Sequence, residues 1–256
     1  MNELTMEQKA ALALGSMTDC CGLLAELSGG MKQNVCYDAY FVPETFWYNR
    51  VSLRPGASDT ETLIGEIADG VKSGALPPLL GWLDQDYADT ELFPLLKRAG
   101  YVPIQKQKAM YLSLDGRAPK AAPPQVETMR PEEAEAWSDA SARGFGKPPE
   151  TGGMVLLANA GKADFLLWRE AGEIIGGTML ACVNGNGGIH EVSTLPEHRG
   201  KGISSALVDR ALDLAAEHGC SCATLQASEL GVPVYSRLGF ETVGIIHNWL
   251  LPPQKT

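Results

Sequence analysis

Residues 188–212 read Gly-Ile-His-Glu-Val-Ser-Thr-Leu-Pro-Glu-His-Arg-Gly-Lys-Gly-Ile-Ser-Ser-Ala-Leu-Val-Asp-Arg-Ala-Leu. The first part, Ile189 to Thr194, has the composition of a strand. A short loop from Pro196 to Gly202, here called the glycine loop, separates it from an amphipathic helix. One face of that helix carries Ile203, Leu207, Ala211 and Leu214. This order of strand, glycine loop and helix decides how the rest of the chain is interpreted.

The glycine loop has the features of a phosphate-binding site. Gly200 and Gly202 allow the backbone to turn with its N–H groups directed inward, where a β-carbon would obstruct a ligand. The following helix directs the positive end of its dipole at the same place, and Arg199 and Lys201 add full charges. The segment therefore predicts a site for a pyrophosphate.

Spacing decides between the common pyrophosphate motifs. A dinucleotide fingerprint requires G-x-G-x-x-G and a later acidic residue, and the third glycine and the acid are both missing. The triphosphate loop G-x-x-x-x-G-K-[ST] is absent. The pattern R-x-x-G-x-G/A fits Arg199, Gly202 and Ser204, with serine in place of the usual last glycine or alanine.

This loop resembles the acetyl-CoA loop of the GNAT-type N-acetyltransferases. A second block, residues 227–241, resembles the same family's late strand, helix and Y-x-x-x-G-F ending, with Tyr235, Gly239 and Phe240 in the motif positions. The two motifs stand in the family's order, and the resemblance covers roughly residues 125–251.

The resemblance implies an α/β (α+β) fold, with a mixed, mostly antiparallel sheet flanked by helices. Two central strands, 189–194 and 223–227, are expected to splay apart and to hold the pantetheine arm of acetyl-CoA between them. The residues expected to bind acetyl-CoA are Val192, Ser193, Thr194, Arg199, Gly200, Lys201, Gly202, Ile203, Ser204 and Ser228. Ser228 replaces an asparagine that is frequent in the family, which puts that contact in doubt.

Direct attack of an amine on the thioester needs a general base, and two residues compete for that role. His190 has the better ordinary pKa, whereas Glu191 ranks slightly first because the alternation places His190 on the face of Val192. Adjacent strand residues face opposite sides, so only one of the two is expected to reach the acceptor. Tyr235 matches the position of the family's tyrosine acid, which protonates the leaving thiolate.

Composition excludes several classes of protein. With 45% hydrophobic and 20% charged residues the chain is typical of a soluble globular protein. The formal net charge of −10 gives no basic surplus, which argues against a nucleic-acid partner. No signal peptide is recognised, and no window is expected to approach the roughly 20 apolar residues of a membrane span. We therefore expect a cytoplasmic protein without a membrane partner, as a monomer or a homodimer.

The six cysteines match no zinc-binding spacing, so no metal is expected and the thiols are expected to be reduced. The chain divides into residues 1–116, a linker at 117–125, and the GNAT domain at 126–256. Near the end of the first half, residues 95–101 read Leu-Leu-Lys-Arg-Ala-Gly-Tyr. They align with residues 234–240, Val-Tyr-Ser-Arg-Leu-Gly-Phe, at an offset of 239 − 100 = 139 residues. This predicts a degenerate GNAT-like repeat in the first half, although a chance match would give the same pattern.

Helices are predicted at 5–28, 58–71, 89–99, 131–142, 153–159, 203–214 and 232–238. Strands are predicted at 46–53, 79–83, 126–129, 165–169, 173–183, 189–194, 223–227 and 242–251, with another that ends near residue 112.

The functional hypothesis is transfer of the acetyl group of acetyl-CoA to a primary amine of a small molecule, or to a protein amino group. The alternatives are a CoA-binding sensor or scaffold without catalysis, which would not need Tyr235, and a protein that binds another nucleotide in the glycine loop.

Overall fold

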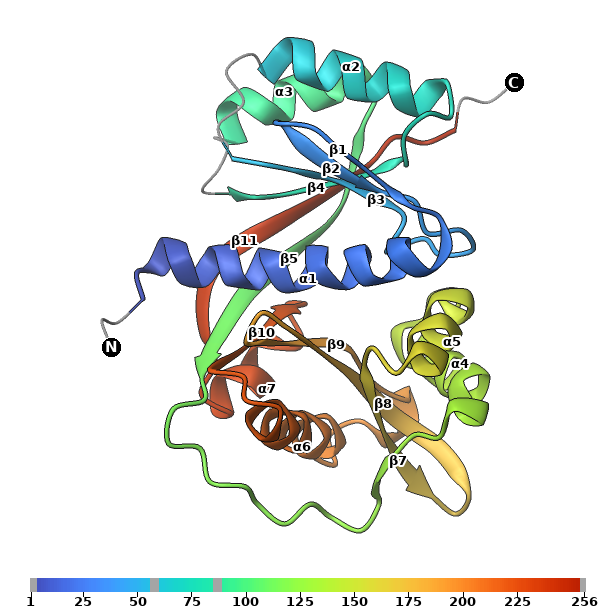
Figure 1. Ribbon diagram of the computed structural model, residues 1–256, viewed down its shortest axis with the longest axis vertical. Helices are drawn as coiled ribbons and strands as arrows, with labels where there is room; N and C mark the ends of the chain where they lie inside the picture. Colours follow the sequence, from blue (N-terminus) through green and yellow to red (C-terminus); the bar gives the residue numbers. More distant parts are fainter. Residues whose placement is uncertain (1–3, 56–59, 85–88, 254–256) are drawn as a thin grey trace.

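The computed structural model describes residues 4–55, 60–84 and 89–253 (Figure 1). Its helices are α1 (Met6–Ser28), α2 (Thr60–Lys72), α3 (Asp89–Ala99), α4 (Ala134–Phe145), α5 (Thr151–Ala160), α6 (Ile203–Glu217) and α7 (Val232–Arg237). Its strands are β1 (Met31–Gln33), β2 (Tyr37–Tyr40), β3 (Arg50–Leu53), β4 (Leu79–Leu83), β5 (Val102–Ser113), β6 (Val126–Thr128), β7 (Asp164–Glu170), β8 (Glu173–Val183), β9 (Asn186–Thr194), β10 (Cys222–Ala227) and β11 (Glu241–Leu250). The 3-10 turn η2 (Pro131–Glu133) precedes α4, and the 3-10 turn η3 (Pro196–His198) forms the first part of the glycine loop.

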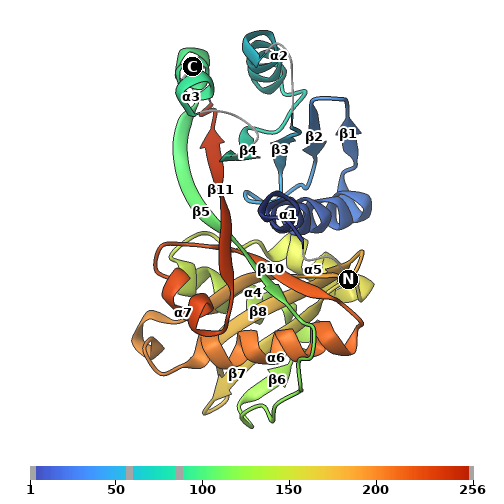
Figure 2. The ribbon, with the colours of Figure 1, turned by 90° about the vertical axis from the view of Figure 1, so that its left-hand side faces the viewer.

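The described strands form one sheet in the order β1-β2-β3-β4-β11-β5-β10-β9-β8-β7-β6. All neighbours are antiparallel except the pairs β3–β4 and β9–β10, which are parallel. Strand β11 lies between β4 and β5, and β5 lies between β11 and β10. The last strand of each half therefore pairs on both sides with strands of the other half. Strands β5 and β11 run together between an upper lobe, which contains α2 and α3, and a lower lobe, which contains α4 to α7 (Figure 2).

Because of this exchange, the division of the sequence into two halves does not divide the structure into two separate sheets. The linker separates the halves in sequence, but the sheet passes through both of them. The parallel pair next to the exchanged strand occurs once in each half, which is the arrangement an internal repeat would produce. The two-domain division and the repeat themselves remain predictions.

Helix α1 lies across the middle of the molecule, between the upper and lower lobes (Figures 1 and 2). It begins with a capping box in which Thr5 and Gln8 exchange side-chain and backbone hydrogen bonds. By length and composition alone the helix is long and apolar enough to span a membrane, so the prediction that no window approaches a membrane span is wrong. In the structure its buried face, which includes Ala13, Met17 and Leu24, packs in the protein core and accounts for the apolar composition.

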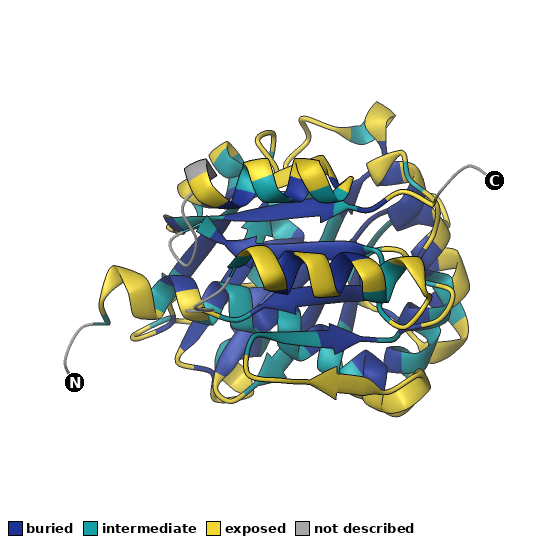
Figure 3. Cartoon of the chain, turned by 90° about the horizontal axis from the view of Figure 1, so that it is seen from above, coloured by how far each residue is buried: buried dark blue, intermediate teal, exposed yellow. Residues whose placement is uncertain are grey.

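Helices cover the sheet on both sides and place the core between the layers. Helix α6 packs against β8 and β9, while α4, α5 and α1 enclose a second cluster centred on Trp137 and Met179. Helices α2 and α3 cover β3 and β4 in the upper lobe. Figure 3 shows the sheet buried along most of its length, with the helices exposed on their outer sides.

Most predicted elements are present, with small shifts at their ends. The predicted strand at 46–53 is wrong in its first half, because only Arg50–Leu53 pairs in the sheet. The backbone N–H groups of Phe46 and Trp47 donate instead to the carboxylate of Glu150. Strands β1 and β2 were not predicted, and the first two residues of the helix predicted at 58–71 lie outside the described residues.

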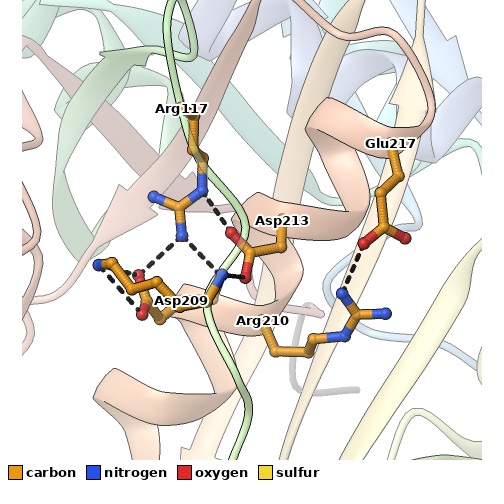
Figure 4. Close-up of polar contacts among 6 residues, drawn as sticks. Arg117, Asp209, Arg210, Asp213 and Glu217 are labelled. Atoms are coloured by element: carbon orange, nitrogen blue, oxygen red, sulfur yellow. Dashed lines mark hydrogen bonds and ion pairs between the residues drawn. The ribbon is translucent and has the colours of Figure 1, made fainter.

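The linker between the halves is irregular but attached to α6 (Figure 4). The Arg117 guanidinium donates to the carboxylates of Asp213 and Asp209, each at 2.7 Å. The backbone N–H of Lys120 adds a 3.0 Å hydrogen bond to Asp213, whose side chain is only 2% exposed. A charge buried this far needs a partner. The linker supplies the partners of the buried Asp213 carboxylate on α6.

Candidate active site

Strands β9 and β10 separate in the middle of the sheet. Their parallel pairing runs from Cys222 opposite Asn186 to Leu225 opposite Ile189 and then stops. Strand β10 continues to pair with β5 as far as Ala227, so only its β9 side opens. The backbone groups of residues 190–194 consequently border a gap, which is the splayed arrangement that the resemblance implies.

A β-bulge at Glu191 interrupts β9 at the start of this gap. Met179 of β8 pairs with His190 and Gly177 pairs with Ser193, so Thr178 faces two residues of β9. Glu191 adopts a φ of 52°, which is uncommon for a residue with a side chain. The bulge changes the alternation of the strand, and His190 and Glu191 both line the same cavity. Which of the two reaches the acceptor stays a prediction.

The cavity has a volume of about 930 Å³ and receives residues from both halves of the chain. The first half supplies Met17, Glu44, Thr45, Phe46, Trp47, Tyr48, Ile104, Gln105 and Gln107. The second half supplies Phe145, Lys147, Pro148, Pro149, Glu150, Ile189, His190, Glu191, Val192, Leu225, Gln226, Ser228 and Tyr235. The lining contains many aromatic and apolar side chains together with the carboxylates of Glu44, Glu150 and Glu191.

Glu191 lies at the centre of a polar network in this cavity. Its side chain is 7% exposed, and it accepts hydrogen bonds from the Tyr48 hydroxyl at 3.1 Å and the Ser141 hydroxyl at 3.2 Å. The Lys147 ammonium lies 3.3 Å from both of its carboxylate oxygens. These contacts come from two segments, the one before β3 and the C-terminal part of α4 with the residues after it, and they fix the carboxylate beside the opening between β9 and β10.

His190 is less suited to the role of base than its ordinary pKa suggests. Its side chain is 8% exposed, and among the described residues its Nε2 has no hydrogen-bond partner. Burial lowers its pKa to about 4, and the favourable effects of Glu191 and of the Ser16 backbone do not compensate for it. At neutral pH the imidazole is uncharged and a weak proton acceptor, which favours Glu191 as the base.

Tyr235, on α7, lines the same cavity as Glu191. Burial raises the pKa of its phenol, so the hydroxyl stays protonated at neutral pH and can donate. The ring packs edge-on against Phe240 at 6.2 Å. At Gly231, before α7, an added β-carbon would lie 2.7 Å from the Tyr235 ring, so glycine at this position leaves room for the tyrosine.

The glycine loop has the predicted backbone conformation. Gly200 and Gly202 have φ angles of 79° and 81°, in the left-handed region that glycine adopts without strain. Gly202 is the N-cap of α6, which begins at Ile203. The first backbone N–H groups of a helix have no partner within the helix, so the loop and the start of α6 provide donors for an anion.

Other residues of the predicted acetyl-CoA site have structural contacts. Arg199 directs its guanidinium to the backbone carbonyls of Gly144, at 2.6 Å, and Thr194, at 3.4 Å. It therefore holds the loop against the end of α4, and its contribution to binding a phosphate stays a prediction. The hydroxyls of Ser204 and Thr194 are hydrogen-bonded at 2.8 Å.

The remaining predicted residues differ in their exposure and in their contacts. Lys201 is exposed on the glycine loop, and its ammonium lies 3.4 Å from His198 Nδ1. Ser193 is buried, and its hydroxyl has no partner among the described residues. Ser228 is exposed at the edge of the cavity, which Val192 also lines. Their roles in binding remain predictions.

Sequence reasoning missed four residues of the site: Tyr48, Ser141, Lys147 and Glu150. Glu150 is buried and accepts hydrogen bonds from the backbone N–H groups of Phe46 and Trp47, at 2.9 and 3.1 Å. Burial raises its pKa. No local motif marks these residues, because their partners lie more than 40 positions away in the chain.

The described residues contain no group of three or more metal-ligating side chains, and all six cysteines are free thiols. The second observation fits the expectation of reduced cysteines, whereas the absence of a metal remains a prediction.

Comparison with known proteins identifies the class. The splayed strands and the glycine loop occur inside residues 127–240, which match the family model of the Acetyltransferase (GNAT) family. The chain thus contains a GNAT acetyltransferase domain. It is 34% identical over 65 residues to an uncharacterized N-acetyltransferase of Methanocaldococcus jannaschii. That match spans 24% of this chain and 29% of the length of the relative.

Solved structures share the fold over nearly the whole chain. A GCN5-related N-acetyltransferase from Kribbella flavida superposes with a TM-score of 0.68 at 17% identity, and covers 95% of this chain and 96% of its own. A putative GNAT-family acetyltransferase from Novosphingobium aromaticivorans gives a TM-score of 0.59 at 15% identity, with 96% coverage of both chains. At these identities the likeness supports the fold alone, and it includes the first half of the chain.

Proposed function

We propose that this protein transfers the acetyl group of acetyl-CoA to a primary amine of a small molecule, by direct attack of the amine on the thioester. The observation that carries the proposal is the position of Glu191. Its carboxylate lines a cavity of about 930 Å³, at the bulge where β9 leaves β10, and the protonated phenol of Tyr235 belongs to the lining of the same cavity. A base, an opening for the thioester and an acid thus share one space.

In this reaction Glu191 accepts a proton from the ammonium of the acceptor, directly or through a water molecule. The amine then attacks the thioester carbonyl, and a backbone N–H at Val192 stabilises the tetrahedral oxyanion. Tyr235 donates a proton to the leaving thiolate as the C–S bond breaks. His190 is neutral at pH 7 and serves as a polar wall of the cavity rather than as the base.

The features around the glycine loop fit the pyrophosphate of CoA. Gly200 and Gly202 hold the backbone in the left-handed region, and α6 starts directly behind them. The open edge of β9 offers unpaired backbone groups to the pantetheine arm, which would pair there as an added strand. The buried hydroxyl of Ser193 is a further polar group near this edge.

A second candidate function is a CoA-binding sensor without catalysis. It would keep the glycine loop but would have no use for a buried carboxylate and a buried phenol in one cavity. Transfer to a protein amino group is a third candidate. The cavity takes its lining from segments in both halves of the chain, which favours a small acceptor over an extended polypeptide.

The test is release of CoA thiol from acetyl-CoA, measured with a panel of small primary amines and of peptides with free amino groups. We expect turnover with at least one small amine and a fall in kcat of about 100-fold or more in Glu191→Gln. Glu44→Gln is the matched control, because Glu44 lines the same cavity but is exposed. Equal loss in both variants, or activity only with peptides, would contradict the proposal.

A further inference from the structure

Lys147 places an amine of the protein itself inside the candidate active site. Its Nζ lies 3.3 Å from each carboxylate oxygen of Glu191 and 4.7 Å from the centre of the Phe145 ring. Of the described residues that line the cavity, Lys147 is the one lysine. Val192 and Tyr235 line the same cavity. A carboxylate and an aromatic face are the two groups that commonly bind an ammonium.

The backbone on both sides of Lys147 holds this amine in place. Gly146 ends α4 in the left-handed conformation, and the backbone N–H of Lys147 donates to Ala142 at 3.1 Å. Pro148 and Pro149 follow and restrict the backbone after it. The side chain retains its four-carbon stem, so the amine can move within the cavity while its attachment point stays fixed.

An amine fixed beside a general base is in the position of an acceptor. Glu191 is within hydrogen-bond contact of the Lys147 ammonium and can remove its proton. Because the amine is part of the same chain, its reaction with bound acetyl-CoA is intramolecular and has a high effective concentration. The other lysines of the described residues do not line this cavity.

We propose that Lys147 is a self-acetylation site, modified by the protein's own bound acetyl-CoA when no external amine is present. This rests on the proposed function. The Lys147 nitrogen forms a bond to the acetyl carbon and the C–S bond of the thioester breaks. The ammonium loses two protons: one passes to solvent through Glu191, and the other balances the proton that the CoA thiolate takes up. The products are Nε-acetyllysine, CoA thiol and one proton.

Acetylation of Lys147 changes the site in two ways. The amide carries no charge, so the ion pair with Glu191 is lost. The added acetyl group also remains in the space next to the base, where an external acceptor must bind. The modified protein is therefore expected to acetylate external amines more slowly, and an excess of a good acceptor is expected to protect Lys147.

The experiment uses the full-length protein, incubated with acetyl-CoA in the absence of any amine and followed by intact mass and peptide mapping. We expect one acetyl group per chain, located on Lys147, with a first-order rate that does not depend on protein concentration. Exposed Lys162 reports background chemical acetylation. Glu191→Gln is expected to slow Lys147 acetylation about 100-fold and to leave Lys162 unchanged, and Lys147→Arg is expected to remove the modification while keeping the charge.

Two results would overturn the inference: Lys147 acetylated no faster than Lys162, or a rate that rises with protein concentration. Acetyl-CoA binding and turnover of external amines are measured on the same sample. Turnover without modification of Lys147 would refute self-acetylation and leave the proposed function intact. Absence of both acetyl-CoA binding and turnover would refute the two together.

Discussion

The burial of His190 predicts a specific dependence of stability on pH. Its pKa falls from 6.5 to about 4 because burial disfavours the charged imidazole. Between these values the unfolded chain binds a proton that the folded chain does not bind, so stability falls as the pH drops through this window. One pKa unit corresponds to about 1.4 kcal/mol, so the full loss, reached below pH 4, is about 3 kcal/mol.

The perturbation is His190→Gln, which removes the titrating group and keeps a polar side chain. The free energy of unfolding is measured by urea denaturation of both proteins at pH 7 and pH 5. Linkage predicts that the wild type loses about 2 kcal/mol more than the variant between these two values. The difference between the proteins cancels the contribution of carboxylates that both contain. An equal loss in the two proteins would refute a buried neutral His190, and with it the argument that favours Glu191 as the base.

Three further substitutions test separate parts of the structure. Tyr235→Phe removes the proposed acid and is expected to lower kcat about 100-fold with a small change in the KM for acetyl-CoA, measured by steady-state kinetics; an unchanged kcat would exclude Tyr235 as the acid. Arg117→Met leaves the buried Asp213 without its charged partner and is expected to lower the free energy of unfolding, measured by urea denaturation, by about 3 kcal/mol. The control Arg210→Met breaks a more exposed pair and is expected to lower it by less than about 1 kcal/mol. Equal losses would contradict a stabilising role of the ion pair between Arg117 and Asp213. Glu150→Ala removes the acceptor of two backbone N–H groups and is expected to cost about 2 kcal/mol or more in thermal unfolding, and no change would contradict this role.

Local sequence patterns predicted much of the fold. Strand β4 and helix α3 have the predicted bounds, because an apolar run of five residues and a helix that ends at Gly100 are defined by neighbouring residues. The backbone also turns at Gly200 and Gly202 as expected, with positive φ angles at both, because a turn of this kind depends on glycine itself. The family resemblance supplied the splayed pair of strands, which periodicity alone does not predict.

Long-range pairing accounts for what the sequence did not predict. The exchange of β5 and β11 depends on contacts between residues more than 100 positions apart, such as Lys106 with His247. The segment before β3 has the composition of a strand, but the carboxylate of Glu150 takes its backbone N–H groups out of the sheet. The position of Lys147 beside Glu191 likewise requires the tertiary fold.

Side-chain direction was the least predictable property of the candidate site. The alternation of β9 places adjacent residues on opposite faces, and a single bulge at Glu191 brings His190 and Glu191 to one cavity. The motif gives Arg199 a charge near the glycine loop, but its guanidinium is bound to two backbone carbonyls. A motif fixes the residue type, whereas the surrounding backbone decides where its side chain points.

The central claim, that the glycine loop binds CoA, is tested most directly by thermal-shift titration with acetyl-CoA, CoA, NAD and ATP. The comparison protein is Gly202→Val, in which a β-branched residue must adopt a φ of 81° at the start of α6. We predict stabilisation of the wild type by the two CoA species alone, and loss of that shift in the variant after correction for its lower melting temperature. No shift with either CoA species, or an equal shift with NAD or ATP, would contradict the account.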